Sequence, residues 1–371
     1  MTPPPIQDRI HSAMIDQSVD LQRYAAGLQQ KVDILMDRLG KDLVRELMDA
    51  GLDTPRTDWQ RARLRALLKT SGERIGETYN GIDNLTGEEL QGLVQVTGQG
   101  ITSAINNSIG ADLMIAPKWT SEQLASIAGD ALIQGAPSSE WWSRQSMEFQ
   151  NAFADQMRQG MLRGETIDQL RDRVLPKIDL RKVAPASRPM IMTARRNAEA
   201  LVRTSTMQVA NDAHFAAYRA NADIMAGFSW MATLDNRTCE SCAVLDCLQW
   251  DLEYQPIGHS MPFPGMPLHW NDRCTSLPVT KSWEQLAKEA HGNSTLAKEL
   301  DKIPHGERAS MDRPVSGNTT YETWFKDQDR ERQMEILGSG RLAIYEKNGL
   351  SLSDLVDGRG NPMTLEQLRA R

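Results

Sequence analysis

The sequence predicts a mainly α-helical protein, with an elongated helical arm, a helical core, a small β-containing Cys/His lobe and a helical C-terminal tail. Two observations lead to this fold class. Before Gly227 and after Ser282, apolar residues recur largely at spacings of three and four, as they do on one face of an α-helix. Between Cys239 and Pro278 the chain is instead rich in proline, glycine and cysteine and lacks apolar periodicity. Such a segment cannot build its own core and needs a staple.

The composition limits the class of protein. Of the 371 residues, 40% are hydrophobic and 25% are charged, which is enough apolar material for more than one domain. The formal net charge of −7 argues against a dedicated nucleic-acid coat, although local contact with DNA stays open. Neither a long apolar run nor a secretion signal is present. We therefore expect no membrane span and folding in a reducing cytoplasm, where clustered cysteines more often bind metal than form disulfides.

Residues 1–118 are predicted to form the N-terminal helical arm. An apolar stripe at spacings of three and four supports this, and it consists of Leu21, Tyr24, Leu28, Val32, Leu35 and Leu39. The motif TGEEL at Thr86 is typical of a helix start, because a threonine hydroxyl caps free amides and an acidic residue follows within the first turn. The glycine-rich residues 93–114 predict a break or a bend in this region.

Residues 119–225 are predicted to form the helical core. The motif TSEQL at Thr120 marks another helix start, and prolines between residues 176 and 189 mark a loop. An alanine-rich helix then begins near Thr193, where the small side chains favour close packing against a neighbouring helix.

Residues 226–281 are predicted to form the lobe, which begins with a short strand leading into an Asp-Asn turn. Residues 282–371 form the predicted tail. A helix starts at Ser282, a polar linker lies near residues 304–318, and the motif TLEQL at Thr364 marks a final helix start.

All four cysteines of the chain lie in the lobe. Cys239 and Cys242 form a C-x2-C pair, and His269 and Cys274 provide two more donors downstream. Zinc prefers a tetrahedron of thiolate and imidazole ligands, and four protein ligands leave no open position for a substrate. These four residues therefore predict a structural Zn²⁺ site whose binding energy folds the lobe.

Other interpretations of the lobe stay open. Cys247 in place of His269 gives an all-cysteine ligand set, and His259 and Asp272 are spare candidate ligands. Without a metal, the cysteines are buried free thiols that pack as small apolar groups, or they form disulfides.

Two motifs of the lobe resemble a known family. They are W-x-A-T-L-D-x-R-T-C-x-x-C and P-L-H-x-N-x-R-C, and they are similar to the head morphogenesis, or minor head, proteins of tailed bacteriophages, the MuF-like family. Members typically have D-x-R-T-C-x-x-C followed by P-P-x-H-x-N-C-R-C. The matching positions are Trp230, Asp235, Arg237, Thr238, Cys239, Cys242, Pro267, His269, Asn271, Arg273 and Cys274. Upstream, the Arg203-Thr204 pair is also similar to the family, as is the tail from Trp324.

The sequence departs from the family pattern at two positions. Asp272 stands where the family has the first cysteine of C-R-C, and Cys247 stands where a glycine is usual. Either residue is a candidate for the vacated ligand position, Asp272 through a carboxylate oxygen.

The resemblance implies a structural virion protein rather than an enzyme. Family members associate with the portal vertex and enter the head in few copies during procapsid assembly, and some are linked to DNA packaging or delivery. The implied partners are the portal protein, the major capsid or scaffolding protein and packaged double-stranded DNA. The implied location is the host cytoplasm during assembly and then the capsid interior or portal vertex of the virion.

Two other functions compete with this one. A metal-dependent nuclease or deaminase is suggested by a histidine among cysteines, but a deaminase needs H-x-E followed by P-C-x-x-C, and here Trp270 and Asn271 follow His269. P-loop, H-E-x-x-H and G-x-S-x-G motifs are also absent from the sequence. A DNA-binding module would use the basic helix residues Arg195, Arg196 and Arg203, together with Arg188. Arg203 is alternatively a brace of the cysteine segment.

Overall fold

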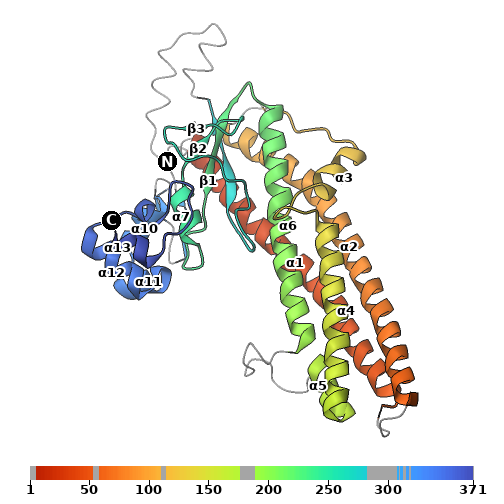
Figure 1. Ribbon diagram of the computed structural model, residues 1–371. Coiled ribbons are helices and arrows are strands. Elements are labelled where there is room, and N and C mark those ends of the chain that lie inside the picture. Colours follow the sequence, from red (N-terminus) through yellow and green to blue (C-terminus); the bar gives the residue numbers. More distant parts are fainter. Residues whose placement is uncertain are drawn as a thin grey trace, which may run out of the picture. The chain divides into compact units, whose positions relative to one another are not determined.

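The computed structural model describes residues 6–52, 58–109, 114–175, 189–281, 307–308, 310–311, 315–316 and 319–370 (Figure 1). Helices dominate these residues, and a small antiparallel sheet accompanies them, so the predicted mainly α fold is confirmed. The chain divides into two compact units. One contains the described parts of Met1–Gln22, Val94–Ser121 and Met207–Arg371, and the other contains those of Arg23–Leu93 and Glu122–Thr206. The domain boundaries expected near residues 118, 225 and 281 stay a prediction.

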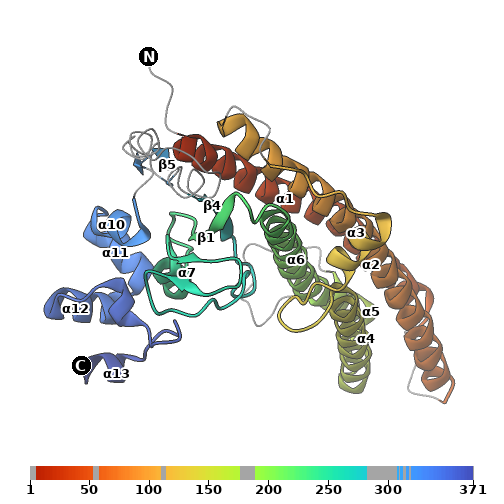
Figure 2. The ribbon, with the colours of Figure 1, turned by 90° about the horizontal axis from the view of Figure 1, so that it is seen from above.

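The second of these units is a helical bundle. Its helices, some of which continue into the first unit, are α1 (Ile6–Asp49), α2 (Asp58–Ile109), α3 (Ser121–Gly129), α4 (Ser138–Arg163), α5 (Ile167–Val174) and α6 (Met190–Ala220). Within the bundle, α1, α2, α4 and α6 lie side by side (Figures 1 and 2). Polar contacts join them: Tyr24 donates to the Glu89 backbone oxygen at 2.8 Å, and the Trp142 indole donates to the Thr86 hydroxyl at 3.0 Å.

The apolar stripe predicted for the first helix lies on its buried face. Leu21, Leu28, Val32 and Leu39 are buried, whereas Tyr24 and Leu35 are partly exposed. Because removing such side chains from water is the main favourable term in folding, the stripe explains why α1 packs as an uninterrupted helix of 44 residues.

One sequence prediction about α2 is wrong. Thr86 does not start a helix but lies inside α2, where its buried hydroxyl donates to the Ile82 carbonyl at 2.9 Å. The glycine-rich residues 93–114 contain the end of α2 as predicted, but the helix continues past Gly98 and Gly100 and ends only at Ile109. At Gly98 an added Cβ would lie 2.3 Å from the Trp119 ring, so this glycine makes room for a neighbouring side chain.

Other predicted helix boundaries are confirmed. Helix α3 begins at Ser121, directly after Thr120. In the tail, Thr364 caps α13 (Leu365–Arg369), and the Gln367 side chain completes the capping box. Helix α6 begins at Met190, close to its predicted start, while the loop prolines Pro176 and Pro185 and the helix predicted from Ser282 lie outside the described residues.

The first unit contains the predicted lobe. Within the described residues a four-stranded antiparallel sheet has the order β3-β2-β1-β4, formed by β1 (Met225–Met231), β2 (Gln249–Trp250), β3 (Pro256–Ile257) and β4 (Thr275–Thr280). The strand predicted after Gly227 is thus confirmed. Gly227 is required by this pairing, because a Cβ there would lie 2.1 Å from the Trp250 carbonyl oxygen.

The core of the lobe is shared with the helix ends of the same unit. Trp230, Trp250 and Phe228 from the sheet pack in one buried cluster with Tyr218 of α6 and with Ile10 of α1. The thiols of Cys242 and Cys274 belong to the same cluster, so the Cys/His segment lies against the hydrophobic core of this unit.

The last described segment, residues 319–370, forms a small helical assembly that we call the C-terminal module. Its elements are α10 (Tyr321–Lys326), α11 (Arg330–Leu337), α12 (Ser339–Asn348), the 3-10 helix η3 (Leu352–Leu355) and α13. Before it lie β5 (Glu307–Arg308) and β6 (Val315–Ser316), which pair with each other in the region of the predicted linker. Among the described residues, no helix combines the length and apolar character that crossing a membrane requires.

Candidate metal centre

The first half of the site lies at the start of a short helix, α7 (Glu240–Leu245). Cys239 is the N-cap of α7, and its sulfur accepts a hydrogen bond from the Cys242 amide at 3.4 Å. Capping fixes the C-x2-C turn, because the sulfur satisfies an amide that the helix leaves free. Cys242 then lies one turn further on and is 1% exposed.

The second half of the site is the turn between His269 and Cys274, directly before β4. The Asp272 amide donates to the His269 carbonyl at 3.2 Å, and Asn271 has a φ of 62°, a conformation that asparagine tolerates better than most residues. The buried Asp272 carboxylate accepts from the Leu268 amide at 2.7 Å and from the Cys274 amide at 2.9 Å. Asp272 therefore anchors the backbone that presents His269 and Cys274.

These two halves bring five donor side chains together. Cys239, Cys242 and His269 form one group and Cys242, Asp272 and Cys274 form another, and within each group the donor atoms lie within 4.8 Å of one another. The His269 Nε2 atom lies 3.1 Å from the Cys239 sulfur and 3.4 Å from the Cys242 sulfur. In tetrahedral zinc, sulfur and nitrogen ligands are about 3.5 Å apart, so the spacing of His269 from these two sulfurs is compatible with a bound metal ion.

The imidazole of His269 is oriented as a metal ligand would be. Its Nδ1 atom lies 2.9 Å from the Trp270 carbonyl oxygen, which can only accept, so Nδ1 carries the proton. Nε2 is then the atom that faces the two thiols. Metal-binding histidines commonly have this second hydrogen bond, because it fixes both the tautomer and the ring orientation.

The thiols differ strongly in acidity. Contact with Cys242, together with His269, lowers the pKa of Cys239 to about 4, and Cys239 in turn raises the pKa of His269 to about 9. Contact with Cys239 raises the pKa of Cys242, and burial raises the pKa of Cys274 to about 12. One thiolate thus forms readily, while the buried thiols need a nearby cation to ionise.

An ion pair that sequence reasoning missed braces the centre. The Arg273 guanidinium donates to both Asp235 oxygens at 2.6 and 2.8 Å, and the two side chains are only 13% and 11% exposed. Burial opposes ionisation of Asp235, but Arg273 and Arg237 together outweigh it and hold the pKa of that carboxyl below its usual value. The pair joins the turn before Cys239 to the turn before Cys274. Both residues stand in the quoted motifs, which is the signal that pointed to them.

Two of the spare candidate ligands lie outside both donor groups. Cys247 is exposed and its thiol lies 3.6 Å from an Asp246 oxygen. Both ring nitrogens of His259 already have backbone partners, at the Gln249 oxygen and the Met261 amide. Of the alternates considered from sequence, Asp272 is the one that the fold brings to the centre.

The three arginines proposed for DNA contact or bracing are placed differently. Arg195 forms an ion pair with Asp37, and Arg203 pairs with Glu199 of its own helix at 2.7 Å. Arg196 is exposed. The brace of the cysteine segment that the structure shows is Arg273, whereas roles of the other three in DNA contact stay a prediction.

A family model matches the part of the chain that contains this site. Residues 151–277 match the family model described as "Phage Mu protein F like protein". The matched segment runs from within α4 into β4 and contains all five donors of the centre. The resemblance to MuF-like phage head morphogenesis proteins is therefore confirmed over these residues. No curated protein and no solved structure matches the chain significantly.

Proposed function

We propose that this chain is a minor head protein of a tailed bacteriophage, incorporated into the capsid during head assembly and associated with the portal vertex. The observation that carries the proposal is the match of residues 151–277, which spans the alanine-rich part of α6, the sheet and the Cys/His centre. Its partners in this proposal are the portal protein, the major capsid or scaffolding protein and packaged double-stranded DNA.

The centre has a structural role in this proposal. Cys239, Cys242, His269 and Cys274 hold Zn²⁺, which supplies a cross-link between α7 and the turn before β4. Asp272 is the weaker candidate ligand, because both of its oxygens already accept backbone amides. Its carboxylate instead holds the second half of the site in a conformation that suits metal binding.

Catalytic turnover is not part of the proposal. Three sulfurs and one imidazole fill the four positions of a tetrahedral zinc ion, so no position is left for a water or substrate. Purified protein incubated with plasmid DNA and Mg²⁺ or Mn²⁺ tests this directly. Metal-dependent cutting that disappears in His269→Ala would replace the structural role with a nuclease.

Purified phage particles test the assembly role. Mass spectrometry of gradient-purified virions is expected to detect this protein at a few copies relative to the major capsid protein. A cryo-EM reconstruction of the head without imposed icosahedral symmetry then locates it, and we expect density at the portal vertex. Absence from particles, or density on the tail alone, would overturn the proposal.

A further inference from the structure

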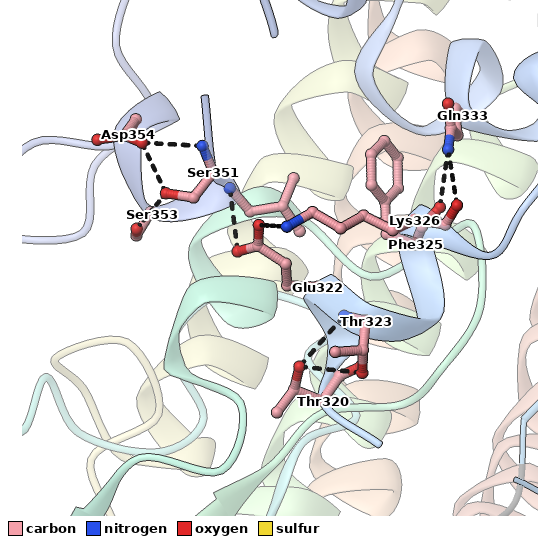
Figure 3. A network of polar contacts seen from close by, with 10 residues as sticks. Thr320, Glu322, Thr323, Phe325, Lys326, Gln333, Ser351, Ser353 and Asp354 are labelled. Carbon is pink, nitrogen blue, oxygen red and sulfur yellow. Dashed lines mark hydrogen bonds and ion pairs between the residues drawn. The ribbon is translucent and has the colours of Figure 1, made fainter. Parts of the chain in front are cut away.

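Most residues of one apolar cluster belong to the C-terminal module, whose helices also have their own caps. Tyr321, Trp324, Phe325 and Leu355 are buried in this cluster, which is separate from the one beneath the sheet and also includes Leu234 and Ala243 of the lobe. Polar contacts also connect elements within the module. The Glu322 carboxylate accepts from the Leu352 amide at 3.2 Å and pairs with Lys326 at 2.8 Å (Figure 3). The module can therefore keep its internal contacts when its external ones are lost.

Helix α7 is the main external contact of the module. Ala243, on α7, is buried within the module's own apolar cluster. Glu240, between the two cysteines of the C-x2-C pair, forms an ion pair with Arg341 of α12, and the two side chains are 12% and 18% exposed. Arg341 also donates to the Leu355 and Met363 carbonyls, so the same guanidinium makes contacts within the module and with Glu240 of α7.

Tyr321 makes the second and third connections. Its amide donates to an Asp246 oxygen at 2.8 Å, and Asp246 is the residue that ends α7. Its hydroxyl donates to the Asp235 backbone oxygen at 2.9 Å, and the Asp235 side chain holds Arg273, which lies next to Cys274. The module thus contacts residues adjoining both halves of the metal centre.

The length of α7 makes these contacts depend on the centre. A helix of six residues is not stable by itself, since helix formation has a costly nucleus, and α7 is held at its first turn by Cys239 and Cys242. Without a cross-link at those two residues, α7 loses the restraint that presents Glu240, Ala243 and Asp246 to the module.

We infer that metal binding at the Cys/His centre and docking of the C-terminal module are coupled through α7. The inference rests on the proposed metal centre. Metal loading keeps the module docked on the lobe, and metal loss releases residues 319–370 as a folded assembly with a different exposed surface. By thermodynamic reciprocity, weakening the docking also weakens metal binding.

Hydrogen–deuterium exchange of the full chain, with Zn²⁺ bound and after chelation, tests the coupling. We expect chelation to increase exchange around residues 239–246 and at the docking residue Tyr321, with smaller changes inside α12. Increased exchange confined to residues 239–274 would overturn the coupling and leave the metal centre standing. A purified chain that binds no Zn²⁺ at all would overturn both.

Two variants test the reverse direction. Arg341→Ala removes the ion pair with Glu240, and Tyr321→Phe removes only the hydroxyl that contacts Asp235. Competition with a chromophoric chelator is expected to show weaker Zn²⁺ binding, by about tenfold for Arg341→Ala, within the usual range of about 5- to 150-fold for coupled sites. Tyr321→Phe should give a smaller change.

Each variant has a matched control inside the module. Arg330→Ala removes an exposed ion pair with Glu346, and Tyr345→Phe removes a hydroxyl that has no hydrogen-bond partner among the described residues. Both controls should keep the wild-type Zn²⁺ affinity. Equal affinities for Arg341→Ala, Tyr321→Phe and their controls would overturn the coupling, even if exchange increased on chelation.

Discussion

The helical bundle and the Cys/His lobe are each stabilised by a different kind of internal contact. In the bundle, α1 contributes a regular series of buried apolar side chains such as Val32, Met36, Leu39 and Leu43. In the lobe, the sheet packs in a buried apolar cluster, but the turns that carry the Cys/His centre depend on a few sulfur, imidazole and carboxylate groups, of which Asp272 alone accepts two backbone amides. Single substitutions should therefore reduce stability gradually in the bundle, where many contacts contribute. In the turns of the lobe, where few contacts contribute, one substitution should have a large effect.

Buried polar groups differ in how far apart in the chain their partners lie. In the bundle, the Thr86 hydroxyl donates to a carbonyl of its own helix and also accepts from the Trp142 indole of another helix. In the lobe, Asp235 and Asp246 connect distant segments, to Arg273 and Tyr321 respectively. The bond within α2 survives changes elsewhere, whereas the contacts between distant segments exist only when their region is folded.

The largest expected effect is loss of the proposed metal ligand Cys239. Cys239→Ser should abolish stoichiometric zinc, about one ion per chain in the wild type, and unfold the lobe, because structural zinc supplies folding energy. Elemental analysis and hydrogen exchange measure the two effects, while the bundle helices should keep their protection. Cys247→Ser is the control, since Cys247 lies outside both donor groups. Equal zinc content in Cys239→Ser and wild type would contradict the proposed site.

The next effect concerns the bundle. Leu43 is fully buried in α1, so Leu43→Ala should lower the free energy of unfolding by about 3 kcal/mol through lost burial and a cavity. Chemical unfolding followed by circular dichroism measures it, and zinc content should not change. Ile34→Ala on the exposed face of α1 is the control, expected within about 0.5 kcal/mol of wild type. Loss of zinc in Leu43→Ala would show that the two regions are not as separate as the comparison holds.

A third prediction separates anchoring from ligation at Asp272. Asp272→Ala removes the acceptor of two backbone amides and should destabilise the lobe by about 2 kcal/mol, with zinc content unchanged. Asp272→Asn keeps one acceptor oxygen and should cost less. Thermal unfolding and elemental analysis measure both properties. If both variants lost zinc in proportion to Cys239→Ser, Asp272 would be a ligand and the four-residue set would be wrong.

A fourth expected effect, similar in size to that of Asp272→Ala, is a pH dependence from His214 of α6. Burial lowers the pKa of His214 to about 3, from an ordinary 6.5 in the unfolded chain. Above pH 6.5 His214 is neutral in both states, and the full free energy of unfolding is available. As the pH falls from 6.5 toward 3, the unfolded chain binds a proton that the folded chain does not, and the free energy of unfolding falls by about 1.4 kcal/mol per pH unit. Between pH 7 and pH 5 the loss amounts to about 2 kcal/mol.

Urea unfolding at several pH values measures this pH dependence of the free energy of unfolding. The variant His214→Gln should show a flatter dependence between pH 7 and pH 5, even if it is less stable at pH 7. His259→Gln is the matched control for replacing a histidine of the same unit. The same slope in His214→Gln and wild type would rule out His214 as the source.

Some features of the fold follow from local sequence, and two threonines, Thr364 and Thr86, illustrate why others do not. Thr364 and Thr86 both precede a Glu or Gln, and only Thr364 caps a helix. Thr86 fails as a helix start because packing against Trp142 keeps α2 helical on both sides of it, a contact made by a residue 56 positions away. Gly98 likewise looks like a helix breaker until Trp119 is known to fill its space.

The candidate site shows the same division. The spacing of Cys239, Cys242, His269 and Cys274 indicated a shared centre, because zinc ligands recur in such pairs. The fold groups Cys239 with Cys242 and His269, and Cys242 with Asp272 and Cys274, so the four-residue ligand set stays a prediction. That Asp272 would join them and Cys247 would not was undecided in the sequence. The backbone decides it: Cys247 follows the end of α7, with a φ of 66°, while Asp272 turns inward to bind two amides.

The sequence by itself determined the mainly helical class, the apolar face of α1, the Cys/His lobe and its resemblance to MuF-like proteins. These depend on periodicity and on motifs within a few residues. Only the tertiary structure decided where α2 continues, which acid anchors the centre, and that Arg273 and Tyr321 meet at Asp235. Those outcomes depend on contacts between residues far apart in the chain, whose geometry no local pattern specifies.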